Sequence, residues 1–390
     1  MSTPSRPLVT LAARPSRARL LPVLVVGALA ALGCTAQVDG PADDEPAVEE
    51  ENAVKVDTRT PEGRAQYDAN VAFANAYVAR CKLPASGKKR AIVTGFGRFM
   101  GLANNATGRM AVGLLPGMEY PETSQPPPGA VDPPGPQLSV AAGAISLPRS
   151  GDVELCVMVL PVYWDLAAIL LAKEIDAFGP DLVLMNGVAG SRQDLWLELG
   201  AVNKAAALDD GSDQLRPATS SGASSAPILE SATSADQARA NLLSWNAVEA
   251  AARAARDVAA ERSDAAGPFG DVLRGVKRAG FPRSSNTYLC NNITYITGYL
   301  MDYPGRTLQL LRSSTRVPGK PSYVKTRISR DTRKTPRVFA HWPSELATRH
   351  TSAGREVMRA VLDAQLSTSE APTRGQNADA APDLAGGSTF

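Results

Sequence analysis

The stretch VELCVMVLPVYWDLAAILLAKEIDAFGPDLVLMNG, residues 153–187, reads as a strand, a helix and a second strand. Residues 153–162 form an almost continuous apolar run, which is typical of a strand buried on both faces. Residues 163–179 have the spacing of an amphipathic helix, and Gly179 is placed to end it. Residues 181–187 are again apolar. A strand, helix and strand in succession predict a parallel sheet covered by helices.

The same alternation continues on both sides of this stretch. RAIVTGF (90–96) indicates another buried strand, and RVFAHWP (337–343) begins as a short one. Helical spacing covers residues 61–81, 238–263, 271–281 and 354–366. The chain is therefore predicted to have an α/β fold. We expect three α/β/α layers around a mostly parallel, mixed central sheet, in a single domain over residues 85–366.

Composition sets the expected limits of that domain. Residues 35–60 are acidic and poor in apolar side chains, which predicts a disordered tether, and residues 61–84 are expected to hold an N-terminal helix. Insertions are expected near residues 116–150, where proline is abundant, and near 204–260. The tail, residues 367–390, is predicted to be disordered.

Residues 1–34 are predicted to be a signal peptide. Arg6, Arg14, Arg17 and Arg19 precede a short apolar run that ends in ALGC (31–34). This ending resembles a bacterial lipobox, with Ala31 where leucine is usual. The resemblance implies that Cys34 is lipidated and anchors an exported lipoprotein to a membrane, on the periplasmic or cell-surface side. Ordinary secretion with cleavage nearby is the alternative.

Charge and cysteine content exclude some classes of function. The chain has 41 basic and 39 acidic residues, which gives no electrostatic reason to expect a nucleic-acid partner. Two histidines without ligand-like spacing do not predict a metal site, and no cofactor is expected. Apart from Cys34 there are three cysteines, Cys81, Cys156 and Cys290, so at least one thiol is free unless chains pair. Pairing of Cys81 with Cys156 stays open.

Three side chains are candidates for chemistry. Cys290 lies before a helical run, and the amide groups of a helix start favour a thiolate, although a free cysteine is more often a buried apolar residue. His341 lies at a strand end, where a histidine is more often structural. Glu198 stands in a strand-like apolar run and faces either solvent or a partner. Ligands bind at the carboxyl ends of parallel strands, so Cys290 and His341 are expected to share one crevice with residues 95–101 and 186–191.

Four short motifs, in order, resemble the pyroglutamyl peptidase I family of cysteine peptidases. They are GFGRFMG (95–101), NGVAGSRQDLWLELGAVN (186–203), SNTYLCNN (285–292) and FAHWP (339–343). The resemblance covers about residues 85–366, with insertions. It implies a phosphorylase/hydrolase-like α/β/α fold and the removal of an N-terminal pyroglutamyl residue from peptides.

The resemblance also implies roles for particular residues. Cys290 would be the nucleophile, His341 the general base and acid, and Glu198 the group that orients His341. Substrate-binding residues carried over in the same way are Phe96, Gly97, Phe99, Asn105, Gly190 and Arg192.

Several positions depart from the family pattern. Met100, Ala106 and Val188 replace a small residue, a proline and a glutamine, and Asn286 replaces a glycine. An ungapped count places Leu208 where the family has an arginine, and Arg216 is a substitute only after a loop insertion. These departures affect the expected specificity more than the chemistry. The alternatives are a cysteine amidase with another substrate and a lipoprotein that binds a peptide or lactam without turnover.

Overall fold

The strand, helix and strand predicted from residues 153–187 are present. They are β5 (Gly151–Leu160), α3 (Leu166–Phe178) and β6 (Leu182–Ala189). Helix α3 ends because Gly179 adopts a φ of 65°, a left-handed conformation that glycine reaches without a steric penalty. The computed structural model describes residues 50–385, apart from residues 85, 100–101, 122–125, 190–192, 262, 265–266, 284–285 and 347.

A mixed sheet forms the centre, with the strand order β15-β7-β19-β6-β3-β5-β4. The strands not yet bounded are β15 (Gly275–Ala279), β7 (Asp194–Glu198), β19 (Arg337–Pro343), β3 (Lys89–Phe96) and β4 (Ser139–Leu147). Strands β19, β6, β3 and β5 are parallel, whereas β7 and β4 run antiparallel to their neighbours β19 and β5. The predicted mostly parallel, mixed sheet is confirmed.

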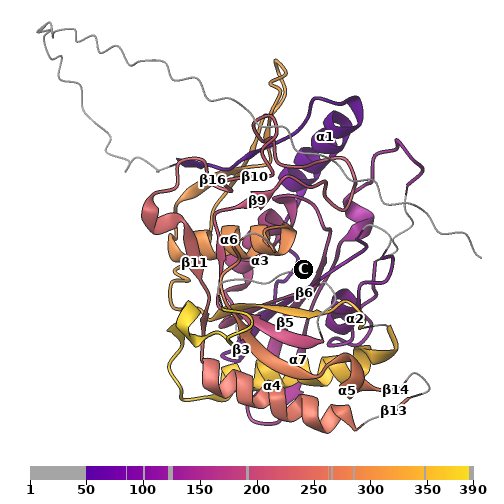
Figure 1. The fold of residues 1–390 in the computed structure, drawn as a ribbon, viewed down its shortest axis with the longest axis vertical. Coiled ribbons are helices and arrows are strands. Elements are labelled where there is room, and N and C mark those ends of the chain that lie inside the picture. The colour runs from indigo at the N-terminus through magenta and orange to yellow at the C-terminus, as the bar shows by residue number, and fades with distance from the viewer. Residues whose placement is uncertain are drawn as a thin grey trace, which may run out of the picture. The chain divides into compact units, whose positions relative to one another are not determined.

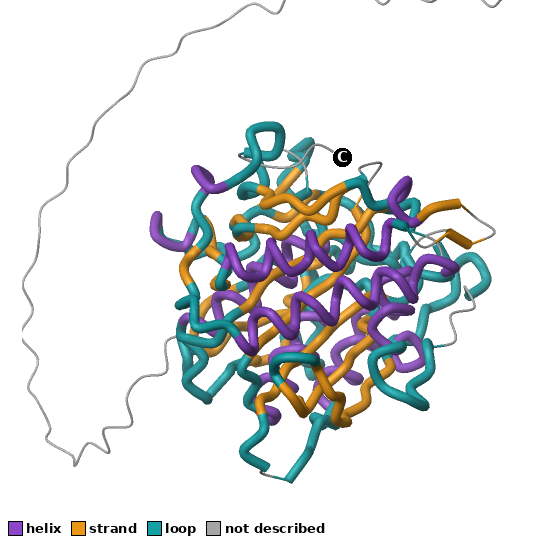
Figure 2. Tube along the Cα trace, turned by 90° about the horizontal axis from the view of Figure 1, so that it is seen from below, coloured by secondary structure: helices purple, strands orange, loops and turns teal. Residues whose placement is uncertain are grey.

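Helices cover both faces of this sheet, as Figure 1 shows. The apolar core on one face includes α1 (Pro61–Ala76), α3 and α6 (Leu289–Asp302). The core on the other face includes α2 (Ala106–Val112), α4 (Trp245–Ala260), α5 (Phe269–Val272) and α7 (Thr351–Ser367). Helices α4 and α7 are the long pair that crosses the strands in Figure 2. The three-layer α/β/α prediction is therefore correct.

Short strands outside this path join distant parts of the chain. Their bounds are β1 (Glu50–Asn52), β16 (Thr307–Leu310) and β18 (Val324–Thr326) in one sheet, and the pairs β2 (Lys55–Val56) with β17 (Arg312–Ser313), β8 (Gly200–Val202) with β11 (Ala238–Ala240), β9 (Ala205–Ala206) with β10 (Ser225–Ala226), and β13 (Ser263–Asp264) with β14 (Gly267–Pro268). Strand β12 (Leu242–Leu243) pairs with β19 and with β20 (Thr373–Arg374). Four 3-10 turns lie at Gly135–Gln137, Ser234–Asp236, Thr348–His350 and Asn377–Asp379.

Both segments predicted to be disordered are partly ordered, so those limits were wrong. The expected tether already forms β1 and β2, because Ala53 and Val56 bury their side chains in the core. In the expected tail, β20 pairs with β12, and Leu384 is buried against Trp196. A few apolar residues that meet long-range partners outweigh a polar local composition.

Two helices differ from their predicted bounds. The helix predicted over residues 271–281 is instead α5, which stops at Val272, followed by strand β15, which pairs with β7. The helix predicted over residues 238–263 starts only at Trp245, because residues 238–243 form β11 and β12. Helix α1 likewise ends at Ala76, short of residue 84. Pairing with neighbouring strands overrides local helical spacing in the first two cases.

The cysteine pairing left open by the sequence is resolved. Cys81 and Cys156 form a disulfide, which joins the segment after α1 to strand β5. Cys290 is the free cysteine of the described residues. Within the same residues, no helix has the length and apolar character needed to cross a bilayer.

Candidate active site

Neighbouring strands bring Glu198 and His341 together. In β19, His341 lies opposite Gly187 of β6 and Trp196 of β7, while Glu198 lies opposite Phe339. Residues two apart in a strand share a face, so the Glu198 side chain is diagonal to the imidazole. Nδ1 of His341 is 2.6 Å from Oε1 of Glu198, and both side chains are buried.

The position of Cys290 follows from α6 and from Gly187. Cys290 is the second residue of α6, and its side chain is partly exposed. A Cβ atom added to Gly187 would lie 3.0 Å from Sγ of Cys290, so the thiol lies over the strand position that pairs with His341. Cys290 lies close enough to His341 to raise the pKa of the imidazole. Since Nδ1 faces Glu198, the imidazole presents Nε2 to the thiol.

The imidazole between these two acidic groups holds its proton strongly. Burial alone would lower the pKa of His341, but the charges of Glu198 and Cys290, with their hydrogen bonds, raise that pKa to about 10. At neutral pH the ring is therefore protonated, so both ring nitrogens are donors. The arrangement is a carboxylate, an imidazole and a cysteine sulfur side by side, which are the groups of a nucleophile with an oriented acid–base partner.

A small cavity opens beside Cys290. It has a volume of about 60 Å³ and is lined by Phe96, Phe99, Asn105, Val162, Val188, Tyr288, Leu289 and Cys290. One water needs about 10–15 Å³ of such space, so the cavity accepts several waters or one small ring. Its walls are mostly apolar, and the ring of Tyr288 packs against Phe99 and Trp164, with centroids 5.8 and 5.4 Å away.

The structure places three of the six expected binding residues at this cavity. Phe96, Phe99 and Asn105 line it. Asn105 also caps α2, because its Oδ1 accepts hydrogen bonds from the amide and hydroxyl of Thr107 at 3.1 and 2.7 Å. Gly97 is not among the lining residues, and its amide donates to Leu160 O at 2.9 Å. Gly190, Arg192 and the lipidation candidate Cys34 lie outside the described residues.

The two positions considered for an arginine, 208 and 216, do not line the cavity. Leu208 is 52% exposed, and its carbonyl accepts a hydrogen bond from the indole of Trp164 at 3.0 Å. Arg216 lies 3.9 Å from Asp57, with which it lines a separate polar depression. Neither position therefore places a cation beside the three candidate side chains.

The two asparagines that follow Cys290 fix the start of α6. The amide group of Asn291 donates to the carbonyls of Val202 and Lys204, at 2.9 and 2.8 Å, and its Oδ1 accepts from the amide of Val202. Nδ2 of Asn292 donates to the buried carboxylate of Asp165 at 3.1 Å. Burial raises the pKa of Asp165 to about 6, although hydrogen bonds from Leu311 and Asn292 oppose the shift. These roles were not predicted from the sequence. The feature of the sequence that could have indicated them is the pair of asparagines directly after the cysteine.

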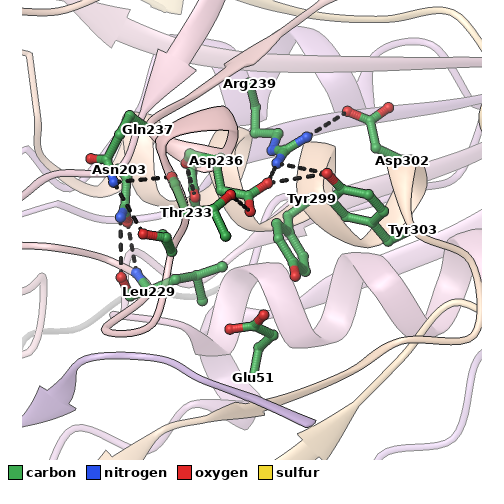
Figure 3. Close-up of polar contacts among 12 residues, drawn as sticks. Glu51, Asn203, Leu229, Thr233, Asp236, Gln237, Arg239, Tyr299, Asp302 and Tyr303 are labelled. Atoms are coloured by element: carbon green, nitrogen blue, oxygen red, sulfur yellow. Dashed lines mark hydrogen bonds and ion pairs between the residues drawn. The ribbon is translucent and has the colours of Figure 1, made fainter. Parts of the chain in front are cut away.

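The other end of α6 is held by charged residues, many of which Figure 3 shows. Arg239 of β11 forms ion pairs with Asp236 and, at 3.6 Å, with Asp302, the last residue of α6. Its guanidinium also donates to the hydroxyl of Tyr303 at 3.2 Å. Asp302 in turn binds Arg337, the first residue of β19, at 2.6 Å. One carboxylate therefore connects the helix that carries Cys290 with the strand that carries His341.

We expect Gly187→Ala to slow the chemistry of Cys290. The added Cβ would lie 2.8 Å from Cζ of Phe339 and 3.0 Å from Sγ of Cys290, so the ring and the thiol must shift by a few tenths of an ångström. A displacement of about 1 Å can cost roughly a hundredfold in rate, so this smaller shift should cost less than that. The measurement is the rate at which iodoacetamide alkylates Cys290. Gly143→Ala on β4 is the matched control, because its added Cβ meets only the side chain of Leu115; equal rates in the two variants would contradict the prediction.

Comparison with known proteins gives remote likenesses only. No family model matches the sequence, and no curated protein matches it. The structure is similar to pyrrolidone carboxyl peptidase from Thermococcus litoralis, with 18% identity, a TM-score of 0.40, and coverage of 71% of this chain and 93% of that one. It is also similar to pyroglutamyl peptidase I of Bacillus amyloliquefaciens, with 14% identity, a TM-score of 0.41, and coverage of 72% and 98%.

Proposed function

We propose that this protein is a cysteine exopeptidase that removes an N-terminal pyroglutamyl residue from peptides. The observation that carries the proposal is the line Glu198–His341–Cys290 at the edge of a small, mostly apolar cavity. A nucleophile, a proton carrier and an orienting carboxylate are the groups that amide hydrolysis through an acyl-enzyme requires.

The chemistry follows from the protonation state of His341. With the imidazole protonated, the thiolate of Cys290 attacks the carbonyl that joins the lactam residue to the next one. His341 gives its proton to the leaving amine as the C–N bond breaks, which leaves a thioester on Cys290. The neutral imidazole then takes a proton from water, whose hydroxide attacks the thioester. Free pyroglutamate leaves, and the thiolate–imidazolium pair is restored.

The start of α6 supplies groups for the oxyanion. The first hydrogen bond along α6 runs from the amide of Asn292 to the carbonyl of Tyr288, so the amides of Leu289 and Cys290 precede it. Tyr288 is the N-cap residue of α6, and its side chain makes no capping hydrogen bond to the first amides of the helix. Free amides at a helix start stabilise the negative oxygen that forms during attack.

The cavity supports an uncharged ring as the bound group. A charged amino terminus would lose hydration among Phe96, Phe99, Val162 and Val188, at a cost of several kcal/mol. A pyroglutamyl lactam carries no charge and is small. Asn105 is the polar side chain of the wall that a lactam would meet.

The same residues support a second candidate. The position expected to hold an arginine is the exposed Leu208. A cysteine amidase that accepts another small, uncharged acyl group would need the same three reactive side chains and the same apolar wall. Export is part of the proposal in both cases, and the Cys81–Cys156 disulfide supports it because such bonds persist in oxidising compartments.

Hydrolysis of a fluorogenic pyroglutamyl amide tests the proposal. We expect the protein, kept in reductant, to release the fluorophore and to be blocked by a pyroglutamyl aldehyde. The control is an otherwise identical amide of proline, whose ring is similar in size but carries a charged amine. Rapid alkylation of Cys290 without hydrolysis of the pyroglutamyl amide would favour the second candidate. Alkylation as slow as that of an ordinary thiol would contradict both.

A further inference from the structure

Asn286 places a second donor on the oxygen of Glu198 that faces His341. Nδ2 of Asn286 is 2.6 Å from Oε1 of Glu198, and Nδ1 of His341 is 2.6 Å from the same atom. Asn286 precedes Cys290 by four residues, on the segment that leads into α6. One short loop therefore carries both the thiol and a contact to the carboxylate at the far side of the imidazole.

The backbone of Asn286 is suited to this contact. Its φ is 55°, in the left-handed region, where asparagine and glycine are favoured over other residues. The conformation turns the side chain back toward Glu198 rather than toward the cavity beside Cys290, whose lining does not include Asn286. Asn286 thus reaches the site through its hydrogen bond to the carboxylate.

Two asparagine side chains hold different parts of Glu198. Nδ2 of Asn241 donates to the backbone carbonyl of Glu198 at 2.8 Å, which fixes the main chain, while Asn286 holds the side chain. Glu198 is 2% exposed, so its oxygens have little access to water as substitute donors. A buried carboxylate that loses a donor is free to rotate away from the imidazole, and a hydrogen bond to a charged group is stronger than one between neutral groups.

We propose that Asn286 is a positioning residue that keeps the carboxylate of Glu198 aligned on His341. The inference rests on the proposed function, because it assigns Asn286 to the same acid–base pair. Asn286 acts through Glu198 and touches neither the thiol nor the bound acyl group. The amide of Asn286 is uncharged. It therefore orients the carboxylate of Glu198 while His341 remains the cation that pairs with that carboxylate.

The first test is Asn286→Gly, which removes the amide and keeps a residue that tolerates a positive φ. We expect kcat for the pyroglutamyl amide to fall about tenfold, while KM stays within twofold. The alkylation rate of Cys290 should fall in parallel, and this second readout needs no substrate. The thermal midpoint of each variant shows whether it has folded.

A second variant separates positioning from a general structural role. Asn286→Asp places a carboxylate against that of Glu198, and two carboxylates at such a distance do not both ionise readily. They share a proton at lower pH and repel each other as the pH rises. The alkylation rate of this variant should therefore decline with rising pH relative to Asn286→Gly, with Cys290, His341 and Glu198 as the charged groups involved.

A double-mutant cycle with Glu198→Gln completes the test. Because a glutamine oxygen would still accept the bond from Asn286, the cycle also uses Glu198→Ala; if Asn286 acts through Glu198, adding Asn286→Gly to Glu198→Ala should lower the rate less than twofold. An undiminished further loss, or an Asn286→Gly variant as active as the parent, would overturn the inference. If the parent does not hydrolyse the pyroglutamyl amide but alkylates rapidly, the specificity fails, and the same comparisons decide the role of Asn286 from alkylation alone.

Discussion

We expect Cys290→Ala to lower kcat/KM for a pyroglutamyl amide by about ten-thousandfold or more, and His341→Ala to do the same. In the proposed mechanism the thiolate of Cys290 forms the acyl bond, and the imidazole of His341, whose pKa the cysteine raises, carries the proton. When two residues act as one unit, removing either of them abolishes most of the rate. The double variant should therefore have nearly the same kcat/KM as each single variant. The measurement is steady-state hydrolysis of the fluorogenic amide beside the parent protein.

Folding controls differ between the two variants. Cys290 is partly exposed, and its replacement leaves the buried Glu198 pair intact. His341→Ala instead leaves the buried carboxylate without its imidazole, so a loss of stability is expected as well. His341→Gln, which keeps a polar side chain, should be compared with it. Activity above about one hundredth of the parent's in a folded Cys290 or His341 variant would refute the assigned roles.

The central fold could be predicted because its signals are local. Residues 153–187 contain two long apolar runs and a helix closed by Gly179, and each element formed where the pattern placed it. The meeting of Cys290 and His341 was also expected, because strand ends and helix starts gather at one edge of a parallel sheet. The end of β3 and the loop after it brought Phe96 and Phe99, respectively, to the same edge for this reason.

The remaining features depend on contacts between distant residues. Glu198 reaches His341 because β7 runs antiparallel to β19 in one register, which joins residues 143 apart in the chain. No local spacing determines that register. The strand β15 was mistaken for a helix because its pairing with β7 is also distant in sequence. The contact of Asn286 with Glu198 depends on a single backbone angle.

The charged residues behind α6 lead to the second large effect, on stability. Asp302 accepts ion pairs from Arg337 at 2.6 Å, Arg374 at 2.7 Å and Arg239 at 3.6 Å. Arg337 is fully buried, and burial lowers its pKa, with Arg374 and Arg239 acting in the same direction and Asp302 opposing them. Without Asp302, the buried guanidinium groups of Arg337 and Arg239 would lose a shared carboxylate partner where water screens charge poorly.

We therefore expect Asp302→Ala to lower the free energy of unfolding by about 3–5 kcal/mol, as loss of one partner from a buried ion pair does. Urea denaturation at neutral pH measures it. Asp331→Ala is the matched control, because Asp331 forms a 2.8 Å pair with Arg333 in which both side chains are 64% exposed, and its loss should leave stability unchanged within error. Equal effects of the two substitutions would contradict the prediction.

Because Arg337 begins the strand of His341 and Asp302 ends the helix of Cys290, Asp302→Ala should also slow alkylation of Cys290 under conditions where the variant is still folded.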